Sequence, residues 1–127
     1  MPVKIVIADD DPTVRNLLVA ELEMEGHEVI CAGDGVAALT AVEQEQPDAL
    51  VLDVMMPELT GWEVLERLRA SERFHALPIV LVSARDVGDD VRHGYELGAN
   101  AVLPKPYSGA ALQDILTTLA QRGGSSA

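Results

Sequence analysis

Acidic side chains follow two short apolar segments of this chain. The run Asp9–Asp11 directly follows one of them, and Asp53 ends the other. If both segments are neighbouring parallel strands, their carboxyl ends meet at the sheet edge where open α/β sheets bind ligands. Crowded carboxylates repel one another unless a cation binds, and Mg²⁺ prefers oxygen ligands from carboxylates and phosphates. The acids therefore predict a divalent-cation site in which an aspartate such as Asp53 can accept a phosphoryl group.

Two further polar side chains complete the predicted site. Ser83 ends a third apolar segment, and Lys105 follows a fourth. A hydroxyl group can donate a hydrogen bond to a phosphoryl group, and an ammonium group can supply a fixed positive charge. Suitable groups at four strand ends predict one phosphoryl-binding site with Asp53 as the acceptor.

Each of these residues also has a purely structural interpretation. Acids near the start of a helix interact favourably with its dipole, so the run Asp9–Asp11 could be a solvated turn. Asp11, which precedes Pro12, fits a helix N-cap better than a metal ligand. Asp53 and Ser83 could be turn residues, and Lys105 could be a surface lysine. Their combination at four strand ends favours the phosphoryl site over unrelated structural roles.

Short apolar segments alternate with segments of helical period, which predicts five βα units and an α/β fold with a parallel sheet covered on both faces. Strands are expected at residues 5–8, 27–32, 49–53, 79–82 and 101–103. Helices are expected at about residues 12–25, 35–44, 61–70 and 86–97, with a last one that carries Leu112, Ile115, Leu116 and Leu119 on one face. The fourth helix contains Gly88 and Gly94 and is predicted to be the least stable, with Val87, Val91 and Tyr95 on its buried face.

Length and composition limit the function. A chain of 127 residues can form one core, and we expect one domain over residues 1–122 with a flexible tail or linker remnant at 123–127. A formal net charge of −12 argues against direct binding of nucleic acid or an anionic membrane. A cytoplasmic location is expected because neither a signal peptide nor a membrane span is predicted. Cys31 lies in an apolar segment and is expected to be a buried, inert thiol.

Over essentially its whole length the chain resembles the receiver domains of bacterial two-component response regulators. The resemblance rests on four motifs in a specific order and spacing. They are Ala8–Pro12, Leu52–Pro57 with Gly61, Val82–Ala84 and Lys105–Tyr107. It implies a flavodoxin-like three-layer sandwich, with a doubly wound, five-stranded parallel sheet of order 2-1-3-4-5 and five helices. It also implies a cis peptide bond between Lys105 and Pro106, against the low base rate of such bonds.

The resemblance implies a function in signal transduction. Receiver domains take a phosphoryl group from the phosphohistidine of a histidine kinase or phosphotransfer protein, here onto Asp53. The implied Mg²⁺, with Mn²⁺ as the alternative, is held by Asp10, Asp53, the backbone carbonyl of Met55 and, through water, Asp9. The implied contacts of the phosphoryl group are Ser83 and Lys105.

The same resemblance implies the partners. Receiver domains are not enzymes with a separate substrate, since they catalyse only their own phosphorylation and a slow autodephosphorylation. Phosphorylation switches binding to an output protein, here expected through the fourth helix, fifth strand and fifth helix. The domain is expected to be a monomer or weak dimer.

One position departs from the usual receiver pattern. Many receivers carry Tyr or Phe three residues before the lysine, and this ring turns inward when the hydroxyl residue moves toward the phosphoryl group. Here the position is Val102. Either Ser83 couples to the fourth helix by another route, or the phosphorylation-sensitive loops are themselves the output surface.

Three other functions compete with this interpretation. A degenerate receiver would act as a phosphorylation-independent docking module, although the complete set of acids, hydroxyl and lysine argues against it. A Mg²⁺-dependent aspartate phosphatase would carry a second acid two residues after the nucleophile, where this chain has Met55. A flavodoxin-like flavin or nucleotide binder would need a phosphate-binding loop after the first strand, where the acids instead repel phosphate.

Overall fold

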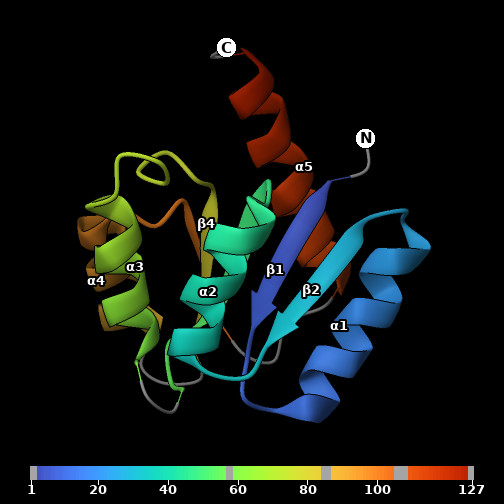
Figure 1. Ribbon diagram of the computed structural model, residues 1–127, viewed down its shortest axis with the longest axis horizontal. Helices are drawn as coiled ribbons and strands as arrows, with labels where there is room; N and C mark the ends of the chain where they lie inside the picture. Colours follow the sequence, from blue (N-terminus) through green and yellow to red (C-terminus); the bar gives the residue numbers. More distant parts are fainter. Residues whose placement is uncertain (1–2, 57–58, 84–86, 105–108, 126–127) are drawn as a thin grey trace.

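A five-stranded parallel sheet forms the centre of the molecule (Figure 1). The computed structural model describes residues 3–56, 59–83, 87–104 and 109–125. The strands are β1 (Lys4–Ala8), β2 (Glu28–Ala32), β3 (Ala49–Asp53), β4 (Ile79–Ser83) and β5 (Ala101–Pro104). The helices are α1 (Pro12–Met24), α2 (Gly35–Glu45), α3 (Gly61–Arg69), α4 (Val87–Leu97) and α5 (Gly109–Ser125). The order β2-β1-β3-β4-β5 confirms the predicted α/β fold.

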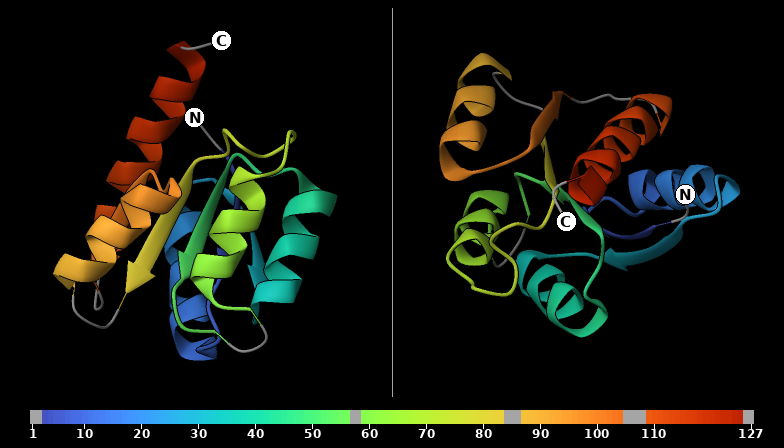
Figure 2. Two further views of the ribbon diagram at one scale, coloured as in Figure 1. Left: turned by 90° about the vertical axis from the view of Figure 1, so that its left-hand side faces the viewer. Right: turned by 90° about the horizontal axis from the view of Figure 1, so that it is seen from above.

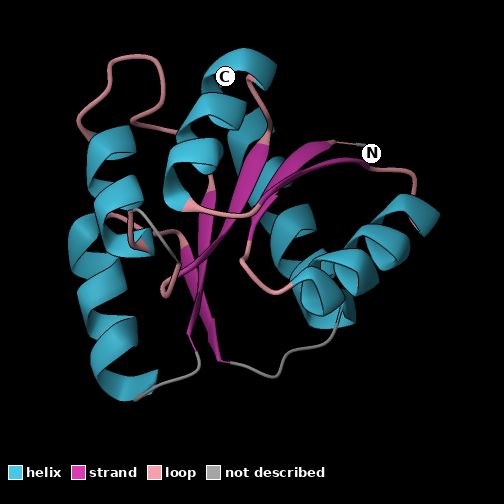
Figure 3. Ribbon diagram, turned by 60° about the horizontal axis from the view of Figure 1, so that its bottom comes forward, coloured by secondary structure: helices cyan, strands magenta, loops and turns pink. Residues whose placement is uncertain are grey.

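Helices cover both faces of the sheet, which is why β3 and β4 are buried along their whole length (Figures 2 and 3). Side chains alternate between the two faces along each strand. On one face, Ile7 and Val51 pack with α1 and α5; on the other, Val6 and Leu81 pack with α2 and α3. Burial on both faces explains why the strands are continuous apolar segments in the sequence.

Side chains cap α1, α2 and α3, the helices whose N-cap residues are described. Asp11 is the N-cap of α1 and accepts a hydrogen bond from the Thr13 N–H at 2.9 Å, as its place before Pro12 predicts. Thr60 and Glu63 form a reciprocal capping box at the start of α3. These bonds satisfy N–H groups that have no partner within the helix.

The expected burial of Cys31 is wrong. Cys31 lies on β2, an edge strand of the sheet, and its side chain is exposed. Local apolar composition does not reveal which strand lies at an edge. Partial desolvation nevertheless raises the pKa of the Cys31 thiol, with Arg15 opposing the shift and Glu23 adding to it. The thiol is therefore mainly protonated at neutral pH, when a cysteine is a poor nucleophile.

The predicted buried face of α4 is also wrong in part. Tyr95 is exposed, whereas Asp90 and Gly94 are buried. A Cβ atom on Gly94 would lie only 2.9 Å from a methyl carbon of Leu81 and from one of Val102. The backbone of α4 therefore lies directly against the sheet. The apolar periodicity failed because the inner face of α4 contains a glycine and a carboxylic acid.

The end of α5 differs from the expected one. The last helix, α5, continues through Gly123 and Gly124 to Ser125, beyond the point where the glycines were expected to end it. Extending an existing helix is much easier than nucleating one, so two glycines at its end can still be helical.

Across the described residues, every helix is too short or too polar to cross a bilayer.

Arg69 links the end of α3 to the turn between α4 and β5. Its Nε donates to the Gly98 carbonyl at 2.8 Å, and Nη2 donates to Asn100 Oδ1 at 2.9 Å. The same Asn100 oxygen accepts a hydrogen bond from the Ile79 N–H at 2.8 Å. Burial lowers the pKa of Arg69 from its ordinary value, but arginine stays protonated at neutral pH. These bonds fix the amino ends of β4 and β5.

We expect Arg69→Ala to lower the free energy of unfolding by about 1–3 kcal/mol, because the partly buried carbonyls of Gly98 and Phe74 lose a charged donor. Arg67→Ala is a matched control on the exposed side of the same helix and should change it by less than about 0.5 kcal/mol. Urea unfolding followed by circular dichroism measures both. Equal losses of stability would show that the Arg69 contacts do not stabilise the fold.

Candidate functional site

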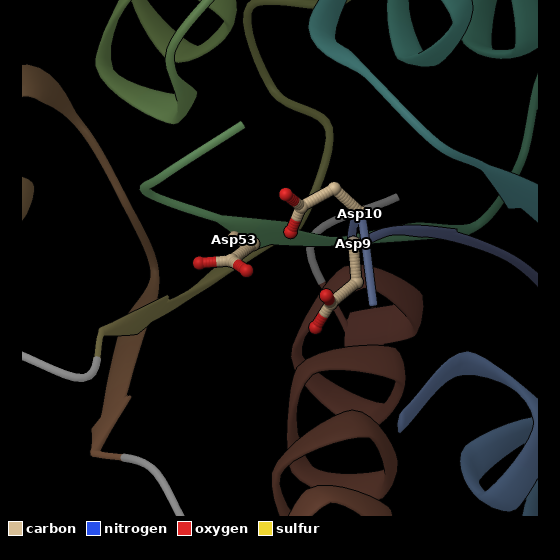
Figure 4. A group of neighbouring side chains, drawn as sticks. All are labelled: Asp9, Asp10 and Asp53. Atoms are coloured by element: carbon tan, nitrogen blue, oxygen red, sulfur yellow. The ribbon is translucent and has the colours of Figure 1, made fainter. Parts of the chain in front are cut away.

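Three carboxyl groups lie next to one another at the carboxyl ends of β1 and β3 (Figure 4). Ala8 pairs with Leu52, so Asp9, which follows β1, and Asp53, which ends β3, lie at the same edge of the sheet. One carboxylate oxygen each from Asp9, Asp10 and Asp53 lies within 4.8 Å of the other two. Asp9 and Asp53 are only 2% and 5% exposed, whereas Asp10 is exposed. The structure thus brings together the three acids that the sequence predicts as metal ligands.

Main-chain and side-chain donors hold Asp9 in place. Its N–H donates to the Ala32 carbonyl at 3.1 Å, which extends the pairing of β1 with β2. Its Oδ1 accepts a hydrogen bond from the Asp11 N–H at 2.9 Å, and its carbonyl accepts one from Arg15 Nη1 at 2.6 Å. This last bond places the positive charge of the Arg15 guanidinium group next to the acids.

Asp53 is fixed by the close packing of α3 against the end of β3. The Gly61 N–H donates to the Val54 carbonyl at 2.8 Å, and a Cβ atom on Gly61 would lie 2.4 Å from the Asp53 carbonyl oxygen. Only glycine permits this approach. The side chain of Asp53 is also held, since its Oδ1 accepts a hydrogen bond from the Met55 N–H at 3.2 Å. The exposed Met55 therefore begins a loop whose backbone is oriented by the Asp53 carboxylate.

Ser83, at the end of β4, is 1% exposed and donates a hydrogen bond to the side chain of Asp90 on α4. Its neighbour Val82 pairs with Asp53, so Ser83 lies one position beyond the acid on the adjacent strand. The other predicted contact of the phosphoryl group, Lys105, lies outside the described residues, as does its bond to Pro106. Asp90 is a site-associated residue that the sequence interpretation missed. It lies on the same helix face as Gly94, four residues later, but the burial of that face is visible only in the structure.

The donor set suits a hard divalent cation. Carboxylate oxygens are the preferred ligands of Mg²⁺, Ca²⁺ and Mn²⁺, whereas thiolates or imidazoles would favour softer metals. Two of the three acids are buried, so their mutual repulsion is less screened by water than it would be on the surface. A cation at this position would relieve that repulsion, which is why these residues fit a metal site.

Comparisons with known proteins agree with this fold and site. A family model of the response regulator receiver domain matches residues 5–117. The response regulator MprA of Mycobacterium sp. (strain KMS) is 43% identical over 119 residues, which are 94% of this chain and 50% of that protein. The chain thus spans about half the length of the curated relatives it matches.

Solved receiver domains have the same fold. The receiver domain of the Francisella response regulator 1452 superposes with a TM-score of 0.88 at 30% identity, covering 95% of this chain and 98% of that one. The receiver domain of the sensor histidine kinase PA1611 from Pseudomonas aeruginosa PAO1 was solved with a magnesium ion coordinated in its active-site cleft. It gives a TM-score of 0.86 at 28% identity, covering 95% and 99% of the two chains. The match over residues 5–117 shows that this chain belongs to the response regulator receiver domain family of two-component signalling.

Proposed function

We propose that Asp53 is the residue on which this receiver domain accepts a phosphoryl group. The observation that carries the proposal is the position of its carboxylate. It is 5% exposed, ends a central strand, and has an oxygen within 4.8 Å of carboxylate oxygens of Asp9 and Asp10. A carboxylate held in this way can act as a nucleophile whose attack is aided by nearby positive charge.

The same cluster supports binding of Mg²⁺, with Mn²⁺ as the alternative. Asp10, Asp53 and the Met55 carbonyl would ligate the ion directly, and Asp9 would do so through water. The ion, when bound, supplies positive charge that lets an anionic phosphoryl donor approach the acids. The magnesium found in the PA1611 receiver domain supports the same assignment in this chain.

In the proposed transfer, an Asp53 oxygen attacks the phosphorus of a phosphohistidine. The P–N bond breaks, the imidazole leaves as the neutral ring after protonation, and an acyl phosphate forms on Asp53. The Ser83 hydroxyl and the Lys105 ammonium group would contact the phosphoryl oxygens. The domain thereby catalyses its own modification and acts on no separate substrate.

The proposed partners are a histidine kinase or phosphotransfer protein and an output protein or domain. We propose that the output contacts α4, β5 and α5, and that the domain acts in the cytoplasm as a monomer or weak dimer. A receiver domain over residues 1–122 belongs to the same proposal, and residues 123–125, which were expected to be a tail or linker, continue α5. The negative charge of the chain, −12, favours a partner surface that is basic or apolar.

Acetyl phosphate with Mg²⁺ should add one phosphoryl group to the wild-type chain, and Asp53→Asn should abolish the adduct because the nucleophile is lost. Intact-mass spectrometry measures the adduct. Asp48→Asn, a change at an acid near the opposite ends of the strands, is the control and should be phosphorylated normally. An adduct that persists in Asp53→Asn would place the acceptor elsewhere.

We expect Asp10→Ala to weaken Mg²⁺ binding by roughly 10- to 100-fold or more, because a ligand is lost. The same change should raise the melting temperature in metal-free buffer, because one of three crowded charges is removed. Isothermal titration calorimetry and thermal unfolding measure the two effects. Asp11→Asn removes one neighbouring charge but keeps a capping side chain, so it should leave Mg²⁺ affinity almost unchanged. Equal Mg²⁺ affinity in Asp10→Ala and wild type would mean that Asp10 is not a ligand.

A further inference from the structure

The hydrogen bond between Ser83 and Asp90 joins the proposed phosphorylation site to α4. Both residues are buried, at 1% and 7% exposure, and the Ser83 hydroxyl is the donor. We propose that Asp90 is a positioning residue that holds the Ser83 hydroxyl until phosphorylation. After phosphorylation, the Ser83 hydroxyl donates its hydrogen bond to the phosphoryl group on Asp53 and no longer to Asp90. The first turns of α4 then lose this contact with β4 and become more mobile. This inference rests on the proposed role of Asp53.

Competition for Ser83 follows from the chemistry of a hydroxyl group. A serine has a single O–H hydrogen, so a strong bond to Asp90 and a strong bond to a phosphoryl oxygen exclude each other. The register of β3 and β4 places Ser83 one position beyond the residue that pairs with Asp53. Rotation about one side-chain bond moves the hydroxyl between staggered positions without moving the strand.

The face on which Ser83 lies explains its present partner. Ile79 and Leu81 pack in the core on the side of the sheet covered by α2 and α3, and the same alternation places Ser83 on that side. Asp53 follows the opposite alternation on β3, in which Val51 packs with α1 and α5. Ser83 therefore starts on the α4 side of the sheet edge and must turn toward Asp53 to reach a phosphoryl group.

The contacts of α4 explain why this bond controls its first turns. Over residues 88–97 of α4 the buried positions are Asp90 and Gly94, and no large apolar side chain of that range is buried to the same degree. Its other end is held more firmly, since Leu97 packs against the core and Arg69 binds the Gly98 carbonyl. Loss of the Ser83 donor removes one buried contact of the first half of α4 and leaves these contacts of the second half unchanged.

This route does not need an aromatic residue at position 102. Val102 touches the inner face of α4, where its methyl group would meet a Cβ atom on Gly94. Its side chain has no ring to rotate and no hydrogen-bonding group, so it cannot respond to a change in the position of the Ser83 hydroxyl. Asp90 can do so, because its carboxyl group is directly bonded to the hydroxyl that moves.

A double-mutant cycle with the phosphoryl mimic beryllofluoride tests the proposal. In the presence of Mg²⁺, Asp90→Ala should raise beryllofluoride affinity roughly tenfold, because Ser83 no longer has to leave a charged acceptor. Asp90→Asn, which keeps the shape but offers a neutral acceptor, should give a smaller increase in the same direction. Asp89→Ala, an exposed acid on the same helix that pairs with Arg92, is the matched control and should change affinity less than about twofold.

The background of Ser83→Ala separates positioning from a structural role. With the hydroxyl absent, Asp90→Ala should have no further effect on beryllofluoride affinity. A residue that only stabilised α4 would give the same change in both backgrounds. Equal effects of Asp90→Ala with and without Ser83, or no effect in either, would overturn the proposal.

Hydrogen exchange gives an independent readout. Beryllofluoride should speed amide exchange in the wild type at residues 88–93 and leave residues 94–97 unchanged. Asp90→Ala should show the faster exchange before the mimic is added. Mass spectrometry of the acetyl phosphate adduct distinguishes the two levels of failure. No adduct on Asp53 in the wild type would overturn both proposals, whereas a normal adduct with uncoupled α4 exchange would overturn only the role of Asp90.

Discussion

Two buried carboxyl groups lie at the carboxyl ends of adjacent central strands, and the surrounding structure holds these like charges together. Asp9 directly follows β1, and Asp53 is the last residue of β3. The strands that carry them are packed on both faces, so the acids cannot move apart without opening the apolar core. Backbone N–H groups of Asp11 and Met55 point at their oxygens. The folded protein therefore concentrates carboxylate oxygens at this edge of the sheet, and concentrated negative charge attracts cations. The stability of the core maintains the charge density at the site.

Much of the fold could be predicted from the sequence because its physical signals are local. Strands buried on both faces are short apolar segments, and an N-cap such as Asp11 is recognisable from the proline after it. The acids of the site could also be predicted, because their position at strand ends is visible in the sequence. The crowded acids, a hydroxyl group and a lysine at strand ends also predicted a cation and a phosphoryl group there. The detailed ligand set and the phosphohistidine donor came from the resemblance to receiver domains.

The wrong predictions concern features that depend on neighbours distant in the sequence. The exposure of Cys31 follows from the place of β2 at the sheet edge, which no local pattern encodes. The inner face of α4 was misplaced because hydrophobic periodicity ranks Tyr95 above Gly94, although close approach to Leu81 and Val102 requires the glycine. Asp90 was missed for a related reason. A buried acid looks like a surface residue until its hydrogen-bond donor is known.

The glycine at position 94 also determines the mechanical character of the contact between α4 and the sheet. Flexible side chains between a helix and a sheet can change rotamer, and they thereby allow the helix to move slightly without moving the sheet. Here the helix backbone faces Leu81 and Val102 with no side chain of its own between them. The contact thus has one layer of side chains instead of two, so a shift of α4 toward the sheet presses on the side chains of Leu81 on β4 and Val102 on β5. Since β5 is the edge strand at that side, the displacement reaches the boundary of the sheet with little loss.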